Sequence, residues 1–82
     1  MYQKSDAVKQ ARKELIQQTL NKISETRDFR ELRRRTFVVF AHLWLHITAE
    51  KEGLFKLEEW SQPESRDKLI EIIKEFLIRH IK

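Results

Sequence analysis

The sequence predicts an all-α fold, a small bundle of three main helices with a fourth, short helix expected in one connector. The 82 residues include one glycine and one proline, too few for the turns that a β-sheet needs. Charged residues make up 37% of the chain, and good helix formers are frequent. Apolar residues also recur at helical spacing over long stretches. The length predicts one domain over residues 1–82.

The first helix is predicted over about residues 6–24. Ser5 and Asp6 can accept hydrogen bonds from the free N–H groups of a first turn. At about 100° per residue, one apolar face is formed by Val8, Ala11, Leu15, Ile16, Thr19, Leu20 and Ile23. The polar break over residues 24–28 lacks glycine and proline. It therefore leaves open whether the first two helices are continuous.

The second helix is predicted over residues 29–52. Asp28 and Glu31 have the spacing of a capping box, in which the Asp28 side chain accepts a hydrogen bond from the backbone N–H of Glu31, three residues on. Gly53 suits the left-handed position after a helix end, where the absence of a Cβ removes a steric penalty.

A connector over residues 54–60 and a third helix over residues 64–80 complete the prediction. Ser61 and Glu64 form a second capping-box pattern, and Pro63 falls in the first turn, where its missing N–H is tolerated. The apolar set of the third helix is Leu69, Ile70, Ile72, Ile73, Phe76, Leu77 and Ile81.

The middle of the second helix is more apolar than a small bundle can easily cover. If residues 37–47 are helical, their apolar side chains span an arc of about 220°, against a little over 100° for an ordinary surface helix. We therefore expect self-association as a dimer, with another protein partner or a covering connector as alternatives. The residues expected in the interface are Phe37, Phe40, Leu43, Trp44, Ile47 and Phe76.

Five arginines occur within nine residues just before this apolar stretch, and the first 36 residues carry ten basic and five acidic side chains. Arginine forks match phosphate oxygens, so the cluster raises nucleic-acid binding as the alternative function. The competing interpretation is a solvated helix end paired with nearby acids. The candidate anion-contacting residues are Arg27, Arg30, Arg33, Arg34 and Arg35.

The three histidines are candidate metal ligands. His42 and His46 are four residues apart, which would place them one helical turn apart, and Glu50 or His80 could add a further ligand. The spacing is also that of exposed or interface histidines, and the sequence contains no HExxH motif and no cysteine. We expect no metal and no other cofactor.

Arg35 and His42 resemble the arginine–histidine pattern of HEPN-type ribonucleases, helical proteins that build an active site across a dimer. The resemblance covers these two residues, and it implies that they would bind and cleave a phosphodiester. No catalytic triad, paired carboxylates or glycine-rich phosphate loop accompanies them. We expect a protein that is not an enzyme.

Membrane insertion is not expected, because the longest apolar run has 14 residues and a spanning helix needs about 20. Attachment to a membrane surface is an alternative, since basic residues precede an aromatic-rich segment. The first residues contain no apolar signal segment, so we expect a soluble, cytoplasmic protein. The predicted function is a non-catalytic interaction or assembly module with a regulatory or scaffolding role.

Overall fold

The computed structural model describes residues 3–81, and their regular elements are all helical. The chain order is α1 (Gln3–Ser24), α2 (Phe29–His42), α3 (His46–Lys51), three single 3₁₀ turns and α4 (Arg66–His80). The 3₁₀ turns are η1 (Leu54–Lys56), η2 (Glu58–Ser61) and η3 (Pro63–Ser65). The predicted all-α class is confirmed.

α1 and α2 are separate helices, which answers the question that the polar break left open. α1 already begins at Gln3, before the predicted cap, and ends at Ser24. Arg66, at the start of α4, holds the following loop by donating to the carbonyl oxygens of Ser24 and Thr26, the latter at 3.3 Å. These bonds from the far end of the sequence help to fix the break between the helices.

At the start of α2 the predicted N-cap residue is confirmed, but its predicted hydrogen-bond donor is not. Asp28 is the N-cap, and its Oδ1 accepts from the backbone N–H of Arg30 at 3.1 Å. The predicted donor is wrong, because the bond comes from Arg30 and not from Glu31, whose carboxylate binds Arg34 and Arg35. The two guanidinium groups lie on the same helix surface, at i+3 and i+4, and satisfy the carboxylate there.

The predicted second helix over residues 29–52 is wrong, because α2 ends at His42 and α3 begins at His46. Trp44 is left-handed, with φ of 60°. Two backbone bonds close the helix end: the Trp44 N–H donates to Ala41 O at 3.2 Å, and the Leu45 N–H to Phe40 O at 2.8 Å. This is a Schellman motif, which is normally completed by glycine at the left-handed position. The apolar arc calculated for an unbroken helix therefore does not exist in that form.

The predicted connector over residues 54–60 forms the 3₁₀ turns η1 and η2, which matches the short helical segment expected there, and η3 follows before α4. Gly53 follows α3 and is left-handed with φ of 77°, as its position predicted. Pro63 begins η3, and α4 starts at Arg66, two residues later than predicted. Trp60 closes the connector on itself, with its indole Nε1 donating to Leu54 O at 2.8 Å.

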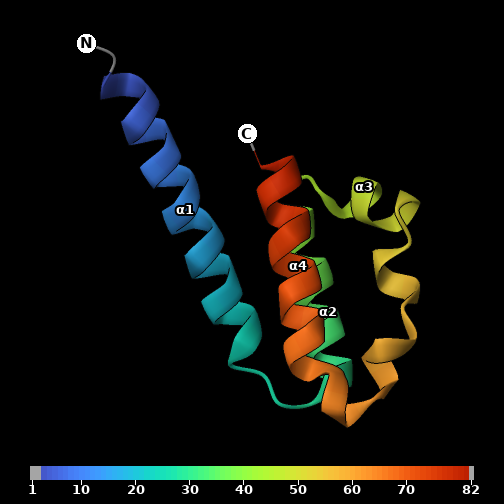
Figure 1. Ribbon diagram of the computed structural model, residues 1–82. Helices are drawn as coiled ribbons and strands as arrows, with labels where there is room; N and C mark the ends of the chain where they lie inside the picture. The colour runs from blue at the N-terminus through green and yellow to red at the C-terminus, as the bar shows by residue number, and fades with distance from the viewer. Residues whose placement is uncertain (1–2, 82) are drawn as a thin grey trace.

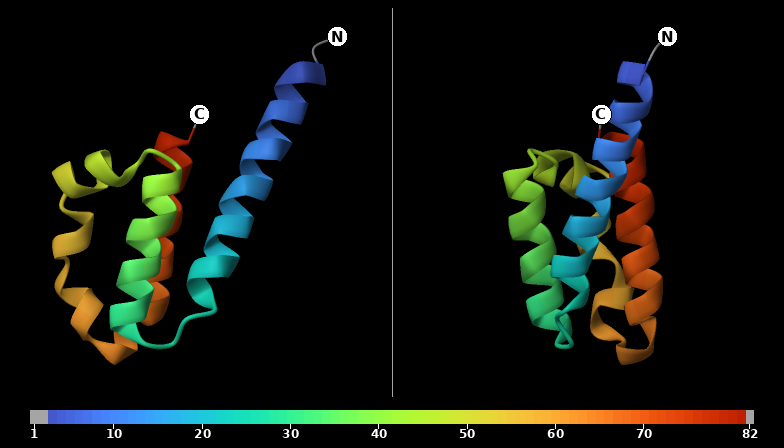
Figure 2. Two further views of the ribbon diagram at one scale, coloured as in Figure 1. Left: turned by 180° about the vertical axis from the view of Figure 1, so that it is seen from behind. Right: turned by 90° about the vertical axis from the view of Figure 1, so that its left-hand side faces the viewer.

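The core lies around α2 and α4, with α1 on one side and the connector on the other (Figures 1 and 2). The rings of Phe40 and Phe76 stack at its centre with centroids 5.2 Å apart. α1 contributes only residues of its C-terminal half to the core. The buried apolar residues are Ile16, Leu20, Ile23, Leu32, Phe40, Leu45, Ala49, Leu54, Phe55, Trp60, Leu69, Ile73, Phe76 and Leu77.

The N-terminal half of α1 projects past the other helices (Figure 1). The 22 residues of α1 span about 33 Å, against about 22 Å for the 15 residues of α4. The radius of gyration is 13.6 Å, whereas a compact chain of this length would have about 12 Å. Val8 on the projecting half is 55% exposed, and Leu15, just past the midpoint of the helix, is 37% exposed. This half of the helix therefore carries an apolar stripe that its own chain does not cover.

Candidate interaction surfaces

The six residues predicted for a dimer interface fall into two groups. Phe40 and Phe76 are 0% and 2% exposed and belong to the chain's own core, so a second copy could reach them only if the fold opened. Their prediction as interface residues is wrong for this fold, in which both are buried. Leu43 is half-buried and packs on the core, while Trp44 and Ile47 are 85% and 55% exposed.

Phe37 and Val38 extend the exposed apolar surface along the last turns of α2. They are 38% and 48% exposed, and the Phe37 ring meets that of His46, at the start of α3, with centroids 6.0 Å apart. We refer to Phe37, Val38, Trp44 and Ile47 as the apolar end of α2. Val38 was not among the predicted interface residues, although its position in the apolar run was the available signal.

Trp44 combines an exposed side chain with an unfavourable backbone conformation. For a residue with a Cβ, the left-handed region costs roughly 1–2 kcal/mol, and glycine avoids most of this penalty. The indole obtains little burial in return, because 85% of the residue is open to solvent. The fold of a single chain therefore gains nothing visible from having tryptophan at this position.

The five predicted anion-contacting arginines differ in whether they already form ion pairs with acidic side chains of the chain. Arg34 binds Glu31 at 2.5 Å and Arg35 lies 3.5 Å from the same carboxylate. The hydrogen bond from Arg34 is the main cause that lowers the pKa of Glu31, and the same contact raises the pKa of Arg34. Arg27 and Arg30 are exposed and form no ion pair within residues 6–81.

Arg33 has a structural role that the sequence did not indicate. Its Nη2 donates to the carbonyl oxygen of Phe55 at 2.5 Å, so it ties α2 to the connector. The Phe55 ring in turn meets the ring of Phe37 edge-on at 5.3 Å. These contacts fix the spacing between α2 and η1.

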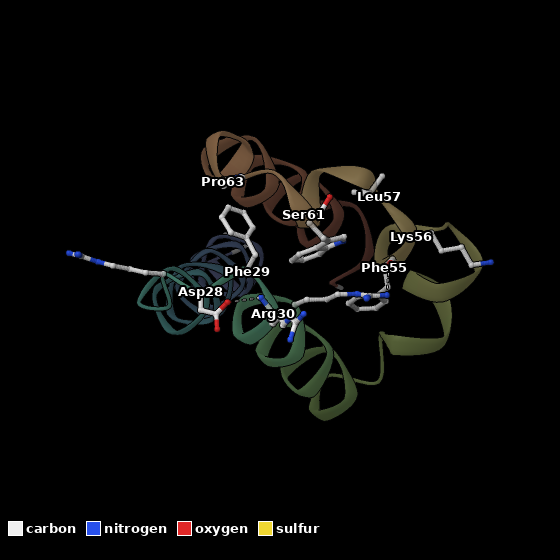
Figure 3. A pocket seen from close by; sticks show the side chains of 11 residues that line it. Asp28, Phe29, Arg30, Phe55, Lys56, Leu57, Ser61 and Pro63 are labelled. Carbon is white, nitrogen blue, oxygen red and sulfur yellow. Dashed lines mark hydrogen bonds between the residues drawn. The ribbon is translucent and has the colours of Figure 1, made fainter.

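A groove with a cavity volume of about 840 Å³ lies between the N-terminal half of α2 and the 3₁₀ turns. Its charged side chains are Arg27, Asp28, Arg30, Arg33 and Lys56. Its apolar lining is formed by Phe29, Phe55, Leu57, Trp60 and Pro63. In Figure 3, Phe29 and Arg30 belong to α2, while Phe55, Lys56 and Leu57 come from the connector. We call this the basic groove.

The basic groove continues into the apolar end of α2. A neighbouring hollow of about 560 Å³ shares Arg30 and Arg33 with it and is also lined by Phe37 and Val38. The outward face of α2 therefore changes along its length from cationic to apolar. Sequence reasoning missed the groove residues that come from the connector, especially Lys56. Nothing in the sequence showed which side of α2 the connector covers.

The structure does not assemble the histidines into a metal site. The turn over residues 43–45 interrupts the helix between His42 and His46, so the one-turn spacing assumed for them is wrong. Within the described residues, no three His, Cys, Asp or Glu side chains are grouped to hold a metal ion. His80 instead lies 2.7 Å from Glu52, which also binds Arg79 at 3.0 Å.

Arg35 and His42, the pair that resembles the HEPN pattern, are both exposed on α2 two helical turns apart. Arg35 faces the Glu31 carboxylate. Among residues 3–81, none of the helices has the length and apolar character needed to cross a bilayer. Searches of protein families, curated proteins and solved structures give no match to this chain.

Proposed function

We propose that this protein is a non-catalytic assembly module whose copies associate through the apolar end of α2. The single observation that carries the proposal is Trp44, a large apolar side chain placed in solvent by a backbone conformation that disfavours it. Strained residues of this kind concentrate at active sites, ligand clamps and switch regions. Tryptophan is also a residue type enriched at the centres of protein interfaces.

The solvent-accessible area of the chain supports association with a second copy. A compact 10.0 kDa monomer exposes about 5200 Å², whereas this chain exposes 6258 Å². The excess of about 1000 Å² includes the projecting half of α1, and it is comparable to the roughly 800 Å² that each partner buries in a standard interface. A second copy is favoured because two-fold pairing buries the same patch on both chains. The projecting stripe of α1 offers further area to the same assembly.

Nucleic-acid binding through the arginine cluster is the second candidate. The observation in its favour is that Arg27 and Arg30 are exposed and without an acidic partner in the described chain. Against it, Arg34 and Arg35 already contact Glu31. Binding that weakens steeply with salt would support this candidate, because phosphate contacts release counterions.

Sedimentation velocity of the wild type and Trp44→Gly tests the proposed assembly. We expect the wild type to dimerise as its concentration rises and Trp44→Gly to stay monomeric with an unchanged helical circular dichroism spectrum. Ile78→Ala is the matched control, because Ile78 is 52% exposed on α4 and lies outside the apolar end. A wild type that remains monomeric at high concentration would contradict the proposal. So would a Trp44→Gly dimer of wild-type affinity.

A further inference from the structure

We propose that the basic groove is a second binding site, which takes an acidic peptide segment carrying a bulky apolar side chain. The groove lies at the opposite end of α2 from Trp44 and would serve a partner other than a second copy. The inference therefore goes beyond the proposed self-association and does not depend on it.

The cationic side chains of the groove favour an acidic ligand. Arg27, Arg30 and Lys56 line the groove, and all three are exposed. Their side chains form no ion pair or hydrogen bond within residues 6–81, unlike Arg34, which binds Glu31. The one acidic side chain in the groove, Asp28, already accepts the capping bond from the backbone of α2. With four cationic side chains against the single carboxylate of Asp28, the groove presents a net positive charge to a ligand.

The floor of the groove indicates what kind of anion fits. Phe29 and Leu57 are half-buried in the lining of the groove, and the rings of Phe55 and Trp60 there are nearly buried. An apolar side chain placed on this floor would be removed from water while neighbouring carboxylates reach the rim. A small inorganic anion would use the rim alone, so the combination points to a peptide with both chemical features.

The same floor argues against a nucleic acid. Single-stranded chains are held by bases that stack on open aromatic faces. Phe55 is 8% exposed and Trp60 is 7% exposed, and these two rings are stacked on each other with centroids 6.3 Å apart. The Trp60 N–H is also bound to Leu54 O. The rings therefore line the groove as apolar surface and offer little face for stacking.

The groove is formed before any ligand arrives. The Arg33 bond to Phe55 O holds α2 against η1, and the Trp60 bond to Leu54 O holds η2 against η1. A site fixed in this way loses little conformational entropy when it binds. We expect binding without a change in helix content.

Fluorescence anisotropy with a labelled synthetic peptide tests the inference. The probe is a short peptide rich in glutamate with leucine and phenylalanine anchors. Two companion peptides replace either every glutamate by glutamine or every anchor by alanine. The protein variant is Arg27→Glu/Arg30→Glu. Lys9→Glu/Lys13→Glu is the matched control, since it changes the net charge equally on exposed positions of α1.

We expect binding of the probe to weaken about tenfold or more in Arg27→Glu/Arg30→Glu and to change little in the α1 control. Both companion peptides should bind more weakly than the probe. Trp44→Gly should bind the probe as the wild type does, which separates this site from the proposed dimer. Equal weakening by both double variants would overturn the inference in favour of unspecific charge attraction. Displacement of the probe by single-stranded RNA at equal or lower concentration would overturn it in favour of a nucleic-acid site.

Discussion

The two ends of α2 differ in how well the residue type suits the backbone position. At the N-terminal end, Asp28 supplies the side-chain cap that the first turn needs, and the residue type matches its position. At the C-terminal end, Trp44 occupies the position that glycine normally fills. The first end stabilises the single chain, whereas the second carries a backbone penalty that the exposed indole does not repay within the chain. This difference is the basis for placing the proposed self-association at Trp44.

The largest expected effect concerns the core that both ends share. Phe40→Ala removes the ring that stacks on Phe76 and should lower the free energy of unfolding by about 3–5 kcal/mol. Urea denaturation followed by circular dichroism measures this loss. If that variant does not fold, Phe40→Leu should fold and show a smaller loss. A Phe40→Ala variant as stable as the wild type would show that the ring is not a core residue.

The N-terminal cap should contribute less than the core. Asp28→Ala leaves the Arg30 N–H without its acceptor, and we expect a loss of about 0.5–2 kcal/mol. Asp28→Ser, which keeps an oxygen acceptor, should recover most of it. The same urea titration applies, and equal stability of the alanine and serine variants would contradict the capping role.

The C-terminal end should respond in the opposite direction. Trp44→Gly relieves the left-handed strain, so the monomer should become more stable by up to about 1 kcal/mol. Trp44→Ala keeps a Cβ and should gain less. Thermal unfolding at a concentration where the wild type is monomeric makes the comparison. A clear destabilisation by glycine would mean that the indole supports the single chain and that the contrast between the two ends is wrong.

The smallest expected effect is the pH dependence due to Glu31. Its folded pKa is lowered, chiefly by the Arg34 hydrogen bond, so its contribution is present above the unfolded pKa. That contribution is lost as the pH falls through the folded pKa. The melting temperature of the wild type should therefore be slightly higher than that of Glu31→Gln near neutral pH. The difference between the two melting temperatures should vanish in acid. A difference that grows in acid would contradict this assignment.

The elements that obey local rules could be predicted from the sequence. The Asp28 cap, the left-handed Gly53 and the periodic faces of α1 and α4 follow from residue type and spacing. The break after His42 could not be predicted, because tryptophan is a poor residue for the left-handed position that ends α2 there. The assumption of one long helix then misplaced Phe40 on an outer surface. The basic groove depends on Arg33 bonding to Phe55, a contact between residues far apart in the sequence.

The central claim is that copies of this chain meet at Trp44, and the two indoles of the wild type provide the most direct test. In a ¹⁵N-correlated NMR dilution series, the Trp44 indole N–H signal should move with concentration as that side chain leaves water. The Trp60 indole, which is bonded to Leu54 O, should stay in place and serve as the internal reference. A Trp44 signal that does not move from dilute to concentrated solution would contradict the account.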